Sequence, residues 1–265
     1  MRIWTVANQK GGVGKTTVVT SLAGLQAQRG QSVLVVDLDP HGSLTSYFGY
    51  DPETVEPNLY ELFRTQGRGG DPSAMTVPTS ISGLELLPAS TSLATLDRQL
   101  GSRKGMGLII RRGLQSMAGR FDYTLLDCPP MLGVLMVNAL AACDHLVVPV
   151  QTEFLAMKGL ERMVHTLEMI ERSRPKPLPY TIVPTLYDKR TRAATRALEE
   201  LRQRYGERVW PGAIPVDTQF REASRDGQPL TVIQPWCRGS MAFRKLLEHL
   251  KEKERAQEAE ALGHG

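Results

Sequence analysis

A short loop near the start of the chain has the composition of a phosphate-binding loop. It follows an apolar run typical of a strand, opens a stretch with helical periodicity, and reads Lys10-Gly11-Gly12-Val13-Gly14-Lys15-Thr16-Thr17. Glycines in such a loop let backbone N–H groups turn toward a polyphosphate, Lys15 is placed to reach the β and γ phosphates, and the Thr16 hydroxyl suits Mg²⁺. The loop therefore predicts a site for ATP, or a close relative of ATP, together with Mg²⁺.

An additional lysine separates this loop from the common pattern G-x-x-x-x-G-K-[ST]. The first glycine of that pattern falls on Gln9, and Lys10 stands beside it. One nucleotide pocket does not need a second cation so close to Lys15, so we expect Lys10 to reach a phosphate held by a facing subunit. The alternative is an ordinary solvated loop lysine.

Two acidic segments follow other strand-like runs. Asp37 and Asp39 come directly after the apolar run 33–36, and Asp127 ends the run 123–126 before two prolines that stop the strand. Open α/β sheets place ligands beyond the carboxyl ends of their strands, and an acid at such a strand end is how P-loop enzymes hold Mg²⁺. The structural alternative for each acid is a helix N-cap or a turn.

The elements that must position these residues alternate between short apolar runs and helix-period stretches. Strands are expected at 3–7, 32–36, 84–87, 123–126, 146–150 and 180–184, and helices at 16–29, 134–142, 153–172, 191–205 and 241 to about 259. Runs such as 33–36 have no polar face, as expected where helices cover both sides of a sheet. The pattern predicts an α/β fold with a doubly wound, mostly parallel sheet.

Composition limits the class of protein. The chain has 265 residues, 41% hydrophobic and 23% charged, with a net charge of +4, which is ordinary for a globular domain. We expect one domain over 1–250 and a polar, frayed tail over 251–265. Three scattered cysteines argue against a disulfide framework or a cysteine-rich metal site. With no signal-peptide pattern and no long apolar tract, we expect a cytoplasmic protein without membrane insertion.

The chain resembles the ParA/MinD family of ATPases with a deviant Walker A motif. The resemblance covers most of residues 1–250 and is carried by 8–17, by Asp37-Leu38-Asp39-Pro40, by Asp127-Cys128-Pro129-Pro130, and by weaker matches at 149–153, 185–191, 214–215 and 222–229. Within the family the chain is more similar to ParA and Soj partition proteins than to MinD, and to the ParC branch that positions chemotaxis arrays at cell poles.

This resemblance implies a P-loop NTPase-type fold and a role for each motif residue. Lys10 would cross an ATP-sandwich homodimer to the partner's nucleotide, Lys15 would hold the β and γ phosphates, Thr17 would contact the α phosphate, and Gly11, Gly12, Val13 and Gly14 would form the cradle. Thr16 would ligate Mg²⁺, Asp37 and Asp127 would orient its waters, and Asp39 would position the attacking water. Activity would be slow, Mg²⁺-dependent ATP hydrolysis, stimulated by a ParB-like or chemotaxis-associated partner.

Departures from the family pattern leave alternatives open. His41 stands where the family usually has Gln, and Val216-Asp217-Thr218-Gln219 lacks the arginines with which nucleoid-binding relatives contact DNA. The leading hypothesis is therefore an ATPase that positions a large cargo, such as a polar chemotaxis array, through protein partners. The alternative is a DNA-partitioning ParA that binds the nucleoid, with Arg190, Arg192, Arg221 and Arg225 compensating. A metabolic P-loop enzyme, such as an amide ligase, is a third class, and a nucleotide-binding protein without turnover is a fourth.

Overall fold

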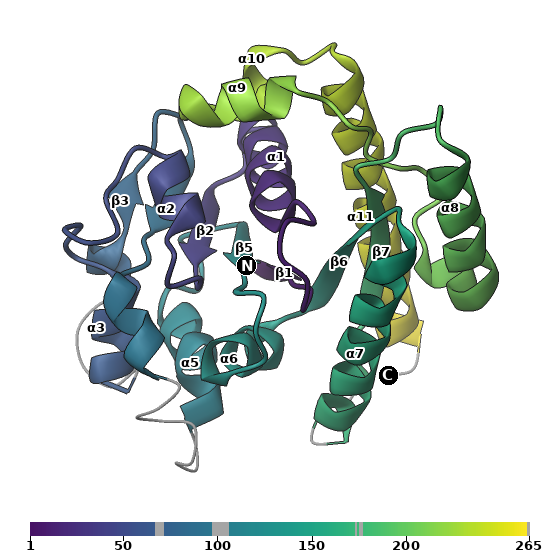
Figure 1. Ribbon diagram of the computed structural model, residues 1–265. Helices are drawn as coiled ribbons and strands as arrows, with labels where there is room; N and C mark the ends of the chain where they lie inside the picture. The colour runs from purple at the N-terminus through teal and green to yellow at the C-terminus, as the bar shows by residue number, and fades with distance from the viewer. Residues whose placement is uncertain (67–71, 97–105, 173, 175–176, 264–265) are drawn as a thin grey trace.

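A seven-stranded sheet forms the centre of the molecule (Figure 1). The computed structural model describes residues 1–66, 72–96, 106–172, 174 and 177–263. Strands follow the order β3-β4-β2-β5-β1-β6-β7, and all neighbours are parallel except β3 and β4. Their bounds are β1 Arg2–Val6, β2 Val33–Asp37, β3 Val77–Pro78, β4 Leu84–Leu87, β5 Tyr123–Asp127, β6 His145–Gln151 and β7 Tyr180–Thr185.

Helices cover both faces of this sheet. The longer ones are α1 Lys15–Gln28, α5 Ile109–Ser116, α6 Val134–Ala142, α7 Phe154–Glu171, α8 Arg192–Tyr205 and α11 Arg238–Gly263. Shorter helices are α2 Ser43–Tyr47, α3 Leu59–Arg64, α9 Gln219–Arg225 and α10 Leu230–Ile233, and single 3₁₀ turns are η1 Pro72–Met75, η2 Thr91–Thr95, η3 Met106–Leu108 and η4 Gly206–Arg208. The expected strands and long helices are all present, within a few residues at their ends.

Alternate side chains of each central strand enter two separate cores. In β2, Val33 and Val35 pack with α1 and α11, whereas Leu34 and Val36 pack with α3, α5 and α6. Both sets are buried, which explains why the strand has no polar face. The predicted doubly wound α/β architecture is confirmed.

The carboxyl ends of β1, β2 and β5 meet at one edge of the sheet. In the parallel register, Asp37 of β2 lies opposite Asp127 of β5, and Asp127 lies opposite Val6 of β1. Neighbouring strands lie about 4.8 Å apart, so the loops that follow these three residues must be in contact. This arrangement brings the glycine-rich loop and both acidic segments together.

The C-terminal helix differs from the sequence expectation. Its apolar face, Phe243, Leu246, Leu247 and Leu250, is buried in the core as expected. However, α11 continues to Gly263 instead of fraying after residue 250. Glu254 explains the extension, because it accepts a hydrogen bond of 2.9 Å from the Tyr123 hydroxyl and pairs with Arg2 Nε at 3.2 Å. The domain boundary at residue 250 stays a prediction. Among the described residues, no helix is both long and apolar enough to cross a membrane.

Candidate functional site

The glycine-rich loop turns directly from β1 into α1. Gly12 and Gly14 adopt φ angles of 73° and 89°, in the left-handed region that glycine enters without strain. A Cβ added to Gly11, Gly12 or Gly14 would meet no atom of the other described residues within 4 Å, apart from the chain neighbours, so the space beside these glycines is open. Val13 points inward, and its carbonyl accepts a 2.9 Å hydrogen bond from the buried Thr185 hydroxyl. The loop therefore presents its backbone N–H groups, at the positive end of α1, to open space.

Two side chains at the start of α1 face this space. The Lys15 ammonium folds back to donate to the Lys10 carbonyl at 3.3 Å, and the Lys15 side chain is largely buried. The Thr16 hydroxyl donates to Asp127 Oδ2 at 2.6 Å. Thr17, the next residue, is half-buried on the same turn. The structure thus brings Lys15, Thr16 and Asp127 together, although they come from distant parts of the sequence.

Asp37 and Asp127 are two buried carboxylates beside this turn. Asp37 Oδ2 accepts hydrogen bonds from the Thr45 amide at 2.8 Å and the Thr45 hydroxyl at 2.7 Å. Burial is the main cause that raises the pKa of Asp37, and burial together with the charge of Asp37 raises the pKa of Asp127. Two acids held together in a low dielectric resist full ionisation unless a cation joins them.

The donor set fits Mg²⁺. Asp127 Oδ1 is fully buried and has no hydrogen-bond partner among the described residues, which is costly for a carboxylate oxygen unless a cation or its water completes the site. Within the described ranges, no three His, Cys, Asp or Glu side chains gather closely enough to hold a metal ion alone. Sparse protein ligation is the usual mode for Mg²⁺, which keeps several waters and takes further oxygens from substrate phosphates. Thr16, Asp37 and Asp127 are the residues that would hold it.

Asp39 lies just beyond Asp37 and is paired with a histidine. Its amide donates to Asp37 Oδ1 at 3.1 Å, and its own Oδ1 lies 2.8 Å from His41 Nδ1 and 3.0 Å from the His41 amide nitrogen. Asp39 and His41 line a hollow of about 420 Å³ whose other walls are mainly apolar, including Pro129, Pro130 and Met131. The carboxylate thus stands at the mouth of the site, where solvent and a second molecule can approach.

The Lys10 side chain lies against the end of β6 and the start of α7. Its ammonium forms an ion pair with Glu153 and lies 3.5 Å from Gln151 Oε1, while its amide donates to Asn8 Oδ1 at 3.2 Å. The Lys10 side chain is 26% exposed, and two large apolar side chains on the same edge, Phe154 and Met131, are 71% and 72% exposed. Lys10 is therefore not an isolated solvated lysine.

Sequence reasoning missed three supporting residues. Thr45 holds Asp37, Glu153 pairs with Lys10, and Asn8 bridges the loop to β6 by donating to the Pro149 carbonyl at 2.8 Å. Asn8 and Glu153 lie inside matched motifs, so a motif comparison gave a signal for both. Nothing in the sequence singles out Thr45.

The comparisons with known proteins place this geometry among nucleotide-dependent ATPases. A family model described as an AAA domain matches residues 1–178. The chromosome partitioning protein ParA of Caulobacter vibrioides is 33% identical over 264 residues, which cover 98% of each chain, and the sporulation initiation inhibitor protein Soj of Bacillus subtilis is 31% identical over 250 residues, 94% of this chain and 98% of Soj.

Solved structures share the whole fold. A cobyrinic acid a,c-diamide synthase of Mycobacterium smegmatis, with bound ADP and magnesium, is 33% identical, has a TM-score of 0.83 and covers 97% of this chain and 96% of its own. A variant of Cyanothece McdA in complex with ATP has a TM-score of 0.83, is 22% identical and covers 95% of each chain. Because the identity is only 22%, the similarity to McdA supports the fold alone.

Proposed function

The chain belongs to the ParA/MinD family of P-loop ATPases, and we propose that it is a Mg²⁺-dependent ATPase whose ATP-bound homodimer positions or partitions a large cellular cargo. The observation that carries this proposal is the placement of two lysines on one loop. Lys15 folds into the site beside Thr16 and Asp127, whereas the Lys10 side chain lies against the end of β6 and the start of α7. In this proposal Lys15 serves the chain's own nucleotide, and Lys10 serves the nucleotide of the partner.

We assign each residue of the candidate site a role in ATP hydrolysis. The loop amides and Lys15 bind the phosphates, Thr17 contacts the α phosphate, and Thr16, Asp37 and Asp127 hold Mg²⁺ and its waters. When bound, Mg²⁺ would supply positive charge beside the phosphates. Asp39 orients the attacking water, and Lys10 of the facing subunit offsets charge that develops on the γ phosphate. Positioning and charge stabilisation suffice, because phosphoryl transfer needs little covalent help from the protein.

Dimerisation gives this chemistry a cellular use. The γ phosphate provides contacts that exist only in the ATP-bound dimer, so hydrolysis removes the free energy that favours the dimer and acts as a timer. We propose slow turnover, stimulated by a ParB-like or chemotaxis-associated partner, in a cytoplasmic protein that can gather at a pole. A polar chemotaxis array is one cargo that fits this scheme, and the position of a fluorescent fusion relative to the array tests it.

The experiment that tests the proposal is light scattering after gel filtration, with ATP or ADP. Wild type should dimerise with ATP only. Lys15→Ala should lose nucleotide binding, Lys10→Ala should bind ATP but stay monomeric, and Asp39→Ala should dimerise yet hydrolyse poorly. A Lys10→Ala variant that dimerises like wild type would show that the cross-subunit role is wrong.

DNA partitioning is the second candidate, supported by the naming of the ParA and Soj relatives and by a basic hollow. Lys189, Arg190, Arg192 and Arg196 line a hollow of about 240 Å³ at the start of α8. Against it, Arg190 is already held by both oxygens of Asp188 at 2.9 and 2.8 Å. This candidate predicts DNA retention that requires ATP, falls steeply with salt, and is lost in the Arg190→Ala, Arg192→Ala double variant.

An amide-forming reaction is the activity that, if found, would replace both proposed functions. The Mycobacterium smegmatis neighbour is described as a diamide synthase, and the hollow beside Asp39 has room for a small second substrate. ATP consumption that needs a carboxylic acid and an amide donor, without any change in oligomeric state, would favour this activity.

A further inference from the structure

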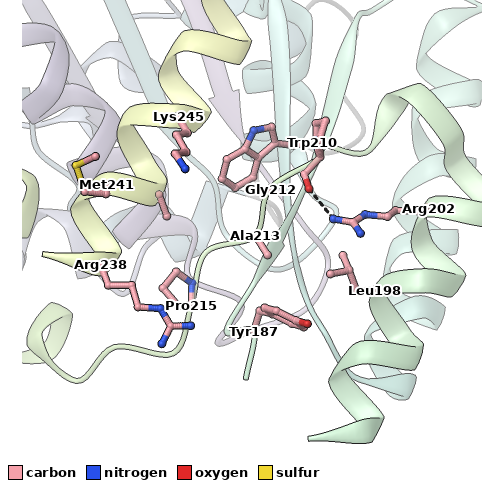
Figure 2. A pocket seen from close by; sticks show the side chains of 12 residues that line it. Tyr187, Leu198, Arg202, Trp210, Gly212, Ala213, Pro215, Arg238, Met241 and Lys245 are labelled. Atoms are coloured by element: carbon pink, nitrogen blue, oxygen red, sulfur yellow. Dashed lines mark hydrogen bonds between the residues drawn. The ribbon is translucent and has the colours of Figure 1, made fainter. Parts of the chain in front are cut away.

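A groove on the outer edge of the sheet lies apart from the residues assigned to ATP. It is lined by α8, by α11 and by the segment 209–216 between them, and none of its residues belongs to the glycine-rich loop or the acidic segments (Figure 2). Its volume is about 490 Å³, within the range of sites that hold small ligands or a few side chains. We call it the α8–α11 groove.

The floor of the α8–α11 groove is fixed by backbone pairing. The Trp210 amide donates to the Ile182 carbonyl at 2.9 Å, and the Ile214 amide donates to the Pro184 carbonyl at 2.8 Å, so the segment runs along the edge of β7. Trp210 is 4% exposed, and a Cβ on Gly212 would lie only 2.4 Å from its ring. Glycine at position 212 is therefore required for the backbone to pass over the indole.

Apolar side chains from both helices complete the lining. The lining includes Leu198 on the α8 side and Met241 on the α11 side, together with Tyr187 and Pro215 (Figure 2). Residues 198 and 202 are one turn apart on α8, and residues 238, 241 and 245 share one face of α11. An apolar side chain of a ligand would thus be enclosed on three sides.

Three cations surround this apolar floor. Arg202 lies on the α8 side, and Arg238 and Lys245 lie on the α11 side (Figure 2). Arg202 Nη2 donates to the Pro211 carbonyl at 2.5 Å, which orients the guanidinium, but none of the three cations forms a salt bridge within the described part of the chain. The lining contains no acidic residue among those described. The groove is therefore complementary to negative charge on both sides of an apolar centre.

We propose that the α8–α11 groove binds an acidic peptide segment of a partner protein. One apolar side chain of the segment packs against Trp210, Leu198 and Met241, and flanking carboxylates meet Arg202, Arg238 and Lys245. A peptide fits better than DNA, because duplex phosphates lie on a convex backbone and gain nothing from a concave apolar floor, whereas an acidic peptide uses both features. The partner is thus identified by its chemistry, an acidic chain with one large apolar residue.

Selection from a random peptide library tests this assignment. Twelve-residue peptides displayed on phage would be selected on the immobilised full-length chain, and the most enriched peptide would be labelled with fluorescein for anisotropy titration. We expect sequences rich in Asp and Glu around one Leu, Phe or Trp. The double variant Arg238→Glu, Lys245→Glu should weaken binding at least about tenfold. The matched control Arg196→Glu, Arg225→Glu, with the same charge change at sites outside the groove, should bind like wild type.

Three results would overturn the assignment. The first is a selection without acidic peptides, or peptides that bind both double variants equally. The second is loss of DNA retention in Arg238→Glu, Lys245→Glu with peptide binding intact, which would make the groove a nucleic-acid contact. The third is a loss of ATP affinity in that variant as large as its loss of peptide affinity, which would mean that the groove is part of the nucleotide site. Failure of ATP-dependent dimerisation in wild type would instead reject the proposed function and leave peptide binding unaffected.

Discussion

The Lys10 ammonium and the Glu153 carboxylate form an ion pair between residues 143 positions apart in the sequence. The two side chains are 26% and 41% exposed. In a single subunit, therefore, the lysine that we assign to the partner's nucleotide is held by its own chain. In the proposed dimer this pair would have to open, because one ammonium cannot remain on Glu153 and also reach across the interface.

Replacing Glu153 should make dimerisation easier. Glu153→Gln removes the charge that holds Lys10, and an exposed pair of this kind is worth about 0.2–1 kcal/mol, so the ATP concentration for half-maximal dimerisation should fall by up to about fivefold. Light scattering during an ATP titration measures this half-maximal concentration. The control is Glu161→Gln, which removes the partner of Arg204 of α8 from the helix that follows Glu153, α7, and it should leave the titration unchanged. A higher ATP requirement in Glu153→Gln would mean that Glu153 assists the dimer.

His41 should act as a positioning residue for Asp39. His41→Ala removes the ring that lies 2.8 Å from Asp39 Oδ1, and because one such hydrogen bond is worth about 1 kcal/mol, kcat should fall by roughly fivefold with the KM for ATP unchanged. His41→Gln keeps a side-chain donor and should recover most of the rate. Steady-state phosphate release measures both parameters. An equal loss in His41→Gln and His41→Ala, or a change confined to KM, would remove this role.

Thr45 should be needed for both stability and magnesium affinity. Thr45→Val keeps the shape of the side chain but removes the hydroxyl that donates to Asp37 and accepts from the Ala89 amide at 2.9 Å. Leaving buried polar groups unpaired costs about 1–3 kcal/mol, so urea unfolding should show a lower free energy of unfolding. ATP hydrolysis by this variant should also need a higher Mg²⁺ concentration for its half-maximal rate.

A matched control for Thr45 is available in β5. Thr124 is equally buried, but its hydroxyl has no hydrogen-bond partner in the part of the chain that the structure describes. Thr124→Val should therefore be neutral or stabilising, because it removes a polar group that the fold leaves unsatisfied. Equal destabilisation by the two substitutions would show that cavity shape, and not the Asp37 contact, sets the cost at Thr45.

Asp127 should make the nucleotide-free protein less stable as pH rises. Burial, with a contribution from Asp37, raises its pKa above the ordinary value of 3.8. The folded state therefore binds more protons than the unfolded state between 3.8 and the raised value, so the stabilisation is complete below that window and is lost as pH increases through it. Asp127→Asn stays neutral and should exceed wild type in Tm at pH 8 by several degrees, since 1 kcal/mol corresponds to about 2–4 °C for 150–250 residues.

Thermal unfolding between pH 5 and pH 8, with and without Mg²⁺ and ADP, tests the Asp127 prediction. Mg²⁺ with ADP should stabilise wild type more than Asp127→Asn. Asp122→Asn serves as the control, because hydrogen bonds from Ser32 lower the pKa of Asp122 below its ordinary value of 3.8. Its contribution is therefore complete throughout pH 5–8 and is lost only below that range, so the Tm difference between Asp122→Asn and wild type should not change between pH 5 and pH 8. A Tm difference between Asp127→Asn and wild type that does not change with pH would contradict the buried-charge argument.

Sequence patterns predicted much of the fold because its central strands are short, continuous apolar runs. The run 33–36 and the helical periodicity after Lys15 do not depend on distant contacts, so both were recognised from local sequence. The contacts that hold α11 beyond residue 250 were not, because they are made with Tyr123 and Arg2, which are far away in the sequence.

By itself, the sequence determined which residues we assign to the candidate site: Lys10, Lys15 and Thr16 on one loop, and Asp37, Asp39 and Asp127 after two strands. It could do so because phosphate binding depends on local backbone freedom and on residue type at fixed spacing. Only the tertiary structure decided that Asp127 meets Thr16, that Thr45 supports Asp37, and that Lys10 is held by Glu153. Those contacts join residues whose distance in space is set by strand order and register, which no local pattern encodes.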